Sequence, residues 1–491
     1  KGPQALALGN WLPLLAVYRD GRLLAEGHER GWARDQYVET GDAFFSQTAD
    51  FLVNLRSDRP LTVAHTGDLV SQEEAAWKFE ARGVREFALV LSPSFASVSQ
   101  VVDGVNISAF YLPGHEAIAN TYLKAAVETV SWMKRTLIPY PYRNLHIAEI
   151  NAAGTSTVGQ EYPNLILMSD GMASGYGGLD SNGGVLAIHE VAHQFYYGIV
   201  GNDQLYEPWL DEAIVTWLSY HLLRASGLPS FSSIWQARVV NPVPPNQPVN
   251  TSIYDYAGDN PYFSVVYRRG ALFLEELYQA MGEEAFFTAL KRYSTALSGR
   301  IATPYALLDT MQAHTEVNLN PIIRRYFSYP RYQASEPLRV SAKYPQQEWS
   351  GPVEVALESN APLREVQVFV DDSFYMLALP AQVIIETGQL DEGRHLLSLR
   401  ASDGQREVDI IGTFVVKQQQ QPPPPPPSIP APTAVPVEAP SEETDIPSMA
   451  SEITITPVAP ETRAAGVTLI ILSVAALALG LSRTSNHDAG R

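Results

Sequence analysis

The stretch IHEVAHQFYYGIVGNDQLYEPWLDEAIVTW, residues 188–217, places two histidines four positions apart within an apolar segment. Residues four apart lie on one face of an α-helix, so His189 and His193 can direct two imidazole nitrogens at one point. Such histidines also occur on solvated helix faces, but the apolar neighbours Val185 and Phe195 predict a buried helix here. A buried pair of imidazoles that face one point favours a metal site.

Zinc is the metal that these ligands predict, and one ion per chain is expected. Zinc binds imidazole nitrogen at about 2.0–2.1 Å and takes four ligands, of which a catalytic site leaves one to water. The expected third protein ligand is Glu212, which eighteen residues separate from His193 and which lies in the helical segment WLDEAIVTW. A loop over residues 198–207 would turn this second helix back beside the first. The chain contains no cysteine, so histidine and carboxylate must supply the ligands.

Glu190 is interpreted as a general base rather than as a ligand. It directly follows His189, where its carboxylate can accept a proton from the water that zinc activates. Structural zinc sites usually have four protein ligands, so three ligands with an adjacent carboxylate favour a catalytic site. The reaction that this arrangement predicts is the attack of water on a peptide carbonyl.

Length and charge limit what the whole chain can be. Its 491 residues, of which 45% are hydrophobic, suffice for several domains of about 100–200 residues each. The net charge of −19 disfavours polyanionic partners such as nucleic acids, because the acidic surface repels phosphate groups. The absence of cysteine excludes a disulfide scaffold and is compatible with any compartment.

The predicted fold class is multidomain α+β. Residues 1–110 consist of apolar or alternating runs separated by Gly, Asp, Ser and Pro, which predicts a partial N-terminal β domain that lacks its front. Residues 111–335 start with a helical segment and two apolar strands, continue through the two zinc helices and end in amphipathic helices. This order is typical of a thermolysin-like zinc peptidase domain.

The remaining residues predict three further parts. Residues 336–417 contain short strands with turn residues between them, which predicts an immunoglobulin-like β-sandwich. Residues 418–463 are rich in proline, which imposes an extended backbone and prevents a core, so they are expected to form a stalk. Residues 464–482 are expected to form a C-terminal transmembrane helix.

The membrane helix is predicted from eighteen uncharged residues, 464–481, which at about 1.5 Å each span about 27 Å. A buried core helix has the same composition, but a helix that follows a stalk has no core to join. Arg483 and Arg491 in the short tail, set against an acidic stalk, favour a cytoplasmic tail. The expectation is a single-pass cell-membrane protein whose catalytic part is extracytoplasmic.

These motifs resemble those of the aminopeptidase N family of zinc metallopeptidases, which includes leukotriene A4 hydrolase, over about residues 1–335. HEVAH with Glu212 in WLDEA is similar to the family's HExxH-x18-E signature. Tyr267 in VYRRGAL is similar to the family's Tyr-x-Lys-Gly pattern, with Arg269 at the lysine position. The resemblance implies that Tyr267 stabilises the oxyanion of the tetrahedral intermediate, a role that suits a phenol donor.

Residues 158–163, VGQEYP, correspond to the family's Gly-x-Met-Glu-Asn segment. The resemblance implies that Glu161 binds the free α-amine of the substrate, because a carboxylate pairs with an ammonium and places the first peptide bond over the zinc. Three residues depart from the family's Gly, Met and Asn: Val158, Gln160 and Tyr162. The family also supplies a second amine-binding residue from its N-terminal β domain, for which Gln4 is the candidate here.

The sequence therefore predicts a membrane-anchored zinc aminopeptidase that acts on peptides with a free N-terminus. One alternative is an endopeptidase on the same scaffold, which would cleave N-acetylated peptides as readily as free ones. The other is a catalytically silent surface protein in which the sandwich binds a partner. Glu190 argues against the silent protein, because a non-catalytic zinc site needs no general base.

Overall fold

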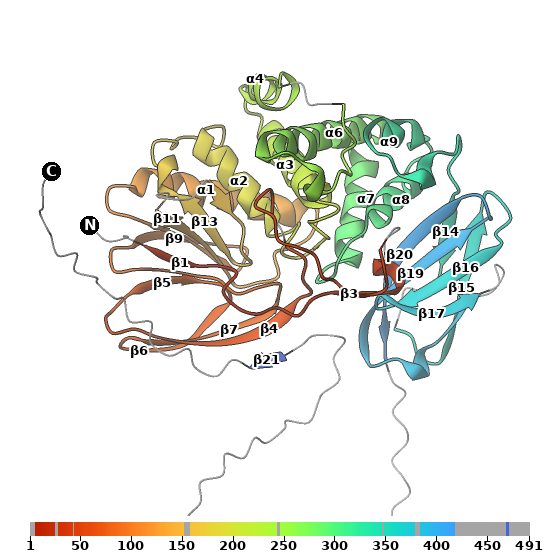
Figure 1. Cartoon of the computed structure of the whole chain (residues 1–491), viewed down its shortest axis with the longest axis horizontal. Coiled ribbons are helices and arrows are strands. Elements are labelled where there is room, and N and C mark those ends of the chain that lie inside the picture. Colours follow the sequence, from red (N-terminus) through yellow and green to blue (C-terminus); the bar gives the residue numbers. More distant parts are fainter. Residues whose placement is uncertain are drawn as a thin grey trace, which may run out of the picture.

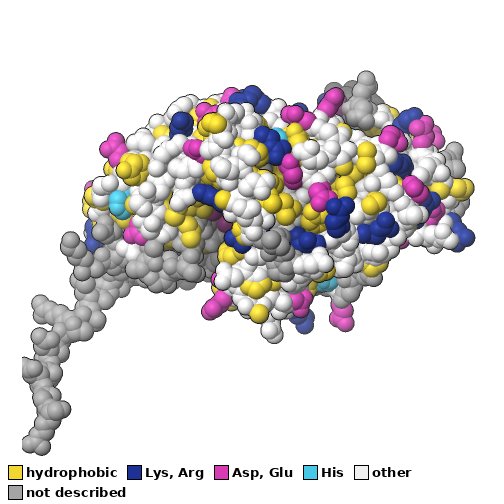
Figure 2. Space-filling model, turned by 90° about the horizontal axis from the view of Figure 1, so that it is seen from above, with side chains coloured by type: hydrophobic (Ala, Val, Ile, Leu, Met, Phe, Trp, Pro, Cys, Tyr) yellow, Lys and Arg dark blue, Asp and Glu magenta, His cyan; other side chains and the backbone are white. Residues whose placement is uncertain are grey.

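The computed structural model describes residues 5–24, 28–42, 44–151, 158–242, 246–345, 348–378, 383–417 and 468–470. Figure 1 shows three parts that follow one another along the chain: N-terminal β-sheets, a central part in which helices cover a further sheet, and a C-terminal pair of sheets. The predicted multidomain α+β class is therefore confirmed. On the face seen in Figure 2, charged side chains of both signs lie interspersed among uncharged ones.

The N-terminal part is built of short strands, most of them antiparallel. One sheet has the order β1-β8-β5, and a second contains β4, β7 and β6 in that order. β4 alternates buried and exposed side chains, so Phe51 and Val53 point into a core shared with Trp77 and Phe79 of β7. The strands are β1 (Leu6–Leu8), β2 (Tyr18–Arg19), β3 (Gly31–Trp32), β4 (Ala49–Arg56), β5 (Thr62–His65), β6 (Asp68–Glu73), β7 (Ala76–Val84) and β8 (Leu89–Ser92).

The central sheet has the order β12-β13-β11-β10-β9, and its three middle strands run parallel. Helix α1 (Glu116–Thr136) packs on one face, while Ala64 and Val90 of the N-terminal part pack on the other. Because both faces are covered, β11 and β13 are buried along almost their whole length. The strands are β9 (Ala96–Val102), β10 (Val105–Tyr111), β11 (Asn144–Ile150), β12 (Gly159–Gln160) and β13 (Leu165–Ser169).

Two features of this sheet bear on the predictions. It begins with β9, so the structural division falls before residue 96 and not at the predicted boundary of residue 110. Strand pairing places β9 in the central sheet, where it lies antiparallel to β10. The short edge strand β12 pairs antiparallel with β13 and lies beside α2 (Asn182–His193), which brings Gly159 and Gln160 to the functional site.

Helices follow α2 along the chain and share its core. α3 (Trp209–Ala225) packs against α2 and against α6 (Gly270–Met281), and the large buried side chains Trp209, Trp217 and Phe273 fill the space between them. A Cβ on Gly270 would lie 2.4 Å from the Cβ of Ala213, so the close contact of α3 and α6 requires glycine there. The other helices of this part are α4 (Phe231–Trp235), α5 (Asp259–Tyr262), the π-helical turn η5 (Phe263–Arg269), α7 (Glu283–Ala296), α8 (Pro304–Ala313) and α9 (Asn320–Tyr326).

The C-terminal part consists of two packed antiparallel sheets, with the orders β14-β15-β18 and β17-β16-β19-β20. Alternating apolar side chains of both sheets and the buried Trp349 form its core. β20 lies against α7 and α8 of the central part. The strands are β14 (Val340–Lys343), β15 (Pro352–Ser359), β16 (Glu365–Val370), β17 (Ser373–Ala378), β18 (Val383–Glu386), β19 (Gly393–Ser402) and β20 (Glu407–Val416).

Buried ion pairs join this sandwich to the rest of the chain. The Arg331 guanidinium lies 3.2 Å from both Asp309 of α8 and Asp409 of β20. Arg22, near the N-terminus, is almost fully buried and pairs with Asp372 in the β16–β17 turn. In Figure 1 the N-terminal segment accordingly reaches the sandwich. Removing one partner of a buried pair is costly, so these contacts hold the three parts together.

The predicted stalk, residues 418–463, lies outside the described residues. Within the predicted transmembrane helix, the structure describes only Thr468–Ile470 (β21), which runs extended and parallel to β4 rather than helical. Among the residues that the structure describes, no helix is both long and apolar enough to cross a membrane.

Candidate metal centre and active site

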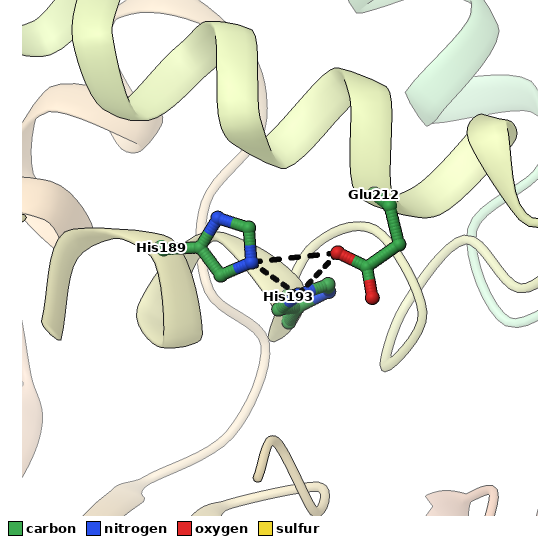
Figure 3. A group of neighbouring side chains, drawn as sticks. All are labelled: His189, His193 and Glu212. Carbon is green, nitrogen blue, oxygen red and sulfur yellow. Dashed lines mark hydrogen bonds and ion pairs between the residues drawn. The ribbon is translucent and has the colours of Figure 1, made fainter. Parts of the chain in front are cut away.

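Two helices bring the three predicted zinc ligands together. His189 and His193 lie one turn apart near the end of α2, and Glu212 lies in the first turn of α3. The Nε2 atoms of the two histidines are 3.1 Å apart, and each lies 3.4 Å from Glu212 Oε2. Figure 3 shows the three side chains converging on one point from the two helices.

This cluster fits a zinc ion. Four ligands at about 2.0–2.1 Å in a tetrahedron would place neighbouring ligand atoms about 3.3 Å apart, close to the observed separations. Among the described residues, the buried Glu212 Oε2 has no hydrogen-bond partner. A buried carboxylate oxygen is normally satisfied, so this atom calls for a cation. When bound, zinc would polarise a carbonyl group and lower the pKa of a coordinated water molecule.

Asp211 orients one of the ligands. Its Oδ1 lies 2.7 Å from His193 Nδ1, and Gln204 donates to its Oδ2. With Nδ1–H donating to Asp211, the lone pair of His193 Nε2 faces the other ligands. Burial disfavours charge on His193, but the neighbouring carboxylates, Asp211 first, hold its pKa well above the ordinary value. Zinc binds neutral imidazole, and Nε2 is the His193 nitrogen that would hold it.

Glu190, the predicted general base, is buried on α2 beside His189. A carboxylate oxygen of Glu190, a carboxylate oxygen of Glu161 and a ring nitrogen of His193 all lie within 4.8 Å of one another. Burial raises the pKa of Glu190 to about 8. Its carboxylate lies directly against strand β12, because a Cβ on Gly159 would be 2.1 Å from Glu190 Oε1. Only a glycine at position 159 therefore leaves room for the Glu190 carboxylate at its observed position.

Tyr267 also lies at the cluster. It belongs to the π-helical turn η5, its hydroxyl donates to Glu212 Oε1 at 2.5 Å, and its ring stacks on His189. π-helical turns often occur at functional sites, where the extra residue redirects a side chain. Arg269, at the family's lysine position, donates instead to the carbonyl oxygen of Arg325.

Glu161 lies near a second acidic residue, Asp42, which the sequence did not predict as part of the site. Glu161 is buried, and the Gln160 amide connects it to Asp42 of the N-terminal part. Burial, and next the charge of Glu212, raise the pKa of Asp42 to about 7, and burial likewise raises the pKa of Glu161 well above its ordinary value. Two such carboxylates would be stabilised by a cationic guest.

The structure offers a further candidate for the second amine-binding residue. Gln4 lies outside the described residues, so its predicted role stays a prediction. Asp42 is the acidic residue from the N-terminal part that the structure places beside Glu161. The sequence carried a weak signal for Asp42, an acid after Gly41 in a loop, and a stronger one for Asp211, which precedes Glu212 in an apolar helix.

We expect Asp211→Asn to weaken zinc binding by about 10–100-fold, because an amide orients and polarises His193 less well than a carboxylate does. The dissociation constant should be measured by competition with a chromophoric chelator. The matched control is Glu207→Gln, which changes a half-buried carboxylate that accepts hydrogen bonds from Trp209 and Tyr329 and lies outside the ligand cluster. Equal zinc affinity in both variants would contradict the role given to Asp211.

Comparison with known proteins agrees with this geometry. The peptidase family M1 domain matches residues 123–326. Aminopeptidase M1-D from Oryza sativa subsp. japonica is 27% identical over 209 residues, which cover 39% of this chain and 24% of that protein. The chain thus spans about a quarter of the length of this relative.

Solved structures of M1 zinc metallopeptidases also align with the chain. A mutant of a two-domain enzyme bound to L-arginine aligns with a TM-score of 0.44 and 19% identity, over 57% of this chain and 64% of that one. A mutant enzyme from Deinococcus radiodurans aligns with a TM-score of 0.44 and 20% identity over the same shares, 57% and 64%. The domain match confirms the predicted family resemblance, and the matched residues 123–326 contain all three candidate ligands.

Proposed function

We propose that this chain is a zinc-dependent aminopeptidase that removes N-terminal residues from peptides and holds one zinc ion. The observation that carries the proposal is the carboxylate pair of the half-buried Asp42 and the buried Glu161, next to the ligand cluster of His189, His193 and Glu212. Two carboxylates beside a metal centre suit a substrate that presents an ammonium close to the bond to be cleaved. The name of the Oryza sativa relative, an aminopeptidase, supports the same reaction.

Each residue of the site has a separate role in the proposed reaction. Glu161 and Asp42 hold the α-ammonium, which limits the distance from the substrate's N-terminus to the scissile bond. Glu190 accepts the proton of the attacking water and returns it to the leaving amine. Tyr267, whose hydroxyl donates to Glu212 in this structure, is the phenol donor available to the carbonyl oxygen as that oxygen gains negative charge.

The alternatives fit these contacts less well. An endopeptidase must accept a peptide chain where Glu161 and Asp42 lie, and an uncharged amide would leave both carboxylates without a cation. A silent binding protein has no use for Glu190, whose buried Oε2 has no hydrogen-bond partner among the described residues. A buried acid without a partner beside a metal centre favours catalysis.

The proposal is tested with aminoacyl-p-nitroanilides, free and N-acetylated, using the full chain with and without chelator. We expect cleavage of free amines only, complete loss with chelator, and a fall in kcat of about 10³-fold in Glu190→Gln at unchanged zinc content. Equal cleavage of acetylated substrates would replace the proposal by the endopeptidase. A zinc-loaded protein without any turnover would replace it by the silent binding protein.

The contact between Gly159 and the Glu190 carboxylate allows a second test of this reaction. Gly159→Ala should displace the Glu190 carboxylate and lower kcat by about 10²-fold, since a shift of about 1 Å in a catalytic group costs about that much. Zinc content should stay unchanged. The matched control is Gly388→Ala, where an added Cβ meets no atom within 4 Å. Full activity of Gly159→Ala would show that the Glu190 carboxylate can move away from the added Cβ without loss of function.

We further propose that residues 464–482 anchor the protein in the cell membrane, with the catalytic part outside and the proline-rich residues 418–463 as spacer. The uncharged run 464–481 and the flanking Arg483 support this arrangement. The full chain should stay with membranes after carbonate extraction, and the chain ending at residue 463 should be released. Release of both would contradict the anchor.

A further inference from the structure

The amide of Gln160 makes two hydrogen bonds that the proposed reaction does not account for. Its nitrogen lies 2.8 Å from Glu161 Oε2 and 3.1 Å from Asp42 Oδ1. An amide NH2 group carries two hydrogens, so it can donate one to each carboxylate at the same time. Gln160 therefore connects an acid of the N-terminal part to an acid of the central part.

These two bonds use one oxygen of each carboxylate. Within the residues that the structure describes, no hydrogen bond reaches Asp42 Oδ2 or Glu161 Oε1. An ammonium group donates up to three hydrogen bonds, so the two remaining oxygens can share it. Two neighbouring carboxylates repel each other unless a donor or a cation lies between them. The Gln160 amide supplies that donor before any substrate arrives.

The backbone of Gln160 is positioned independently of the site. It lies in the edge strand β12, where Gln160 is paired with Leu167 of β13. The aminopeptidase N family has methionine at the corresponding place, and methionine has a similar reach but no N–H donor. The bridge between the two acids is therefore a property of this chain's own sequence.

We propose that Gln160 is a positioning residue that holds Asp42 and Glu161 together as one receptor for the substrate's α-ammonium. Gln160 acts through the two carboxylates and does not take part in the chemistry. This inference rests on the proposed aminopeptidase function and goes beyond it, because it makes the amine site a joint product of two structural parts. Without the bridge, Asp42 is free to move away from Glu161, and the ammonium keeps a single carboxylate partner.

The test is Gln160→Met in the full chain, which keeps the length of the side chain and removes both donors. We expect the KM for L-alanyl-p-nitroanilide to rise about tenfold with kcat within about twofold, since hydrogen bonds to charged groups contribute about that much to binding. The Kd of L-leucinamide, measured by calorimetry in a Glu190→Gln background so that the amide is not hydrolysed, should rise by the same factor. Gln279→Met, an exposed glutamine that donates to Glu275, is the matched control and should change neither constant.

A double-mutant cycle separates positioning from a general structural role. In an Asp42→Asn background the bridge is already weakened, so adding Gln160→Met should change KM by less than about twofold. A structural effect would instead be additive and change KM equally in both backgrounds. Gln160→Glu, which keeps the shape and adds a third negative charge, should raise KM more than Gln160→Met does.

Three results would overturn the inference: unchanged KM and Kd in Gln160→Met, equal changes in both backgrounds, or an unchanged KM in Gln160→Glu. If the wild-type chain hydrolyses amides and Gln160→Met binds as the wild type does, only the bridge fails. If the wild-type chain has no turnover but binds L-leucinamide in a way that depends on Gln160, the bridge stands and the aminopeptidase function fails.

Discussion

Negative charge buried around two histidines is the constraint on which the rest of the site depends. Five carboxylates lie in or beside the ligand cluster: Asp42, Glu161, Glu190, Asp211 and Glu212. Burying carboxylates so close together is unfavourable unless protons, hydrogen-bond donors or cations compensate. The carboxylates show this cost, because burial raises the pKa of Glu190, Asp42 and Glu161 and so favours their protonated forms. A divalent metal at the histidines and an ammonium group at Asp42 and Glu161 would supply the compensating positive charge.

The architecture supplies these groups from separate elements. The pair α2 and α3 carries the ligand cluster, the edge strand β12 brings Gly159 and Gln160, and the π-helical turn η5 brings Tyr267. Asp42 comes from the N-terminal part, so the proposed amine site spans a boundary between two parts. Ion pairs at Arg22 and Arg331 hold the sandwich against both. Positions defined by several packed elements suit a site whose groups must stay within about 0.5 Å.

Local spacing explains what could be predicted. His189 and His193 are one helical turn apart whatever the fold, so the pattern alone predicts that they share a face. The position of Glu212 depends only on a pair of helices joined by one loop, residues 194–208, and the structure brings Glu212 to both histidines. Asp42 could not be predicted in this way, because no periodicity connects it to Glu161, more than a hundred residues later. The predicted Gln4 lies outside the described residues, and it is the packing of the N-terminal part that places Asp42 beside Glu161.

The sequence by itself determined the class of chemistry, the α+β class and the residues that are close along the chain, because helical periodicity and ligand chemistry are local properties. Only the tertiary structure decided the sheet to which β9 belongs, the support of His193 by Asp211 and the bridge from Gln160 to Asp42. The physical reason is that strand pairing and charge burial depend on which distant segments meet. Many pairings satisfy the same apolar pattern, and their relative free energies are set by the whole packed molecule.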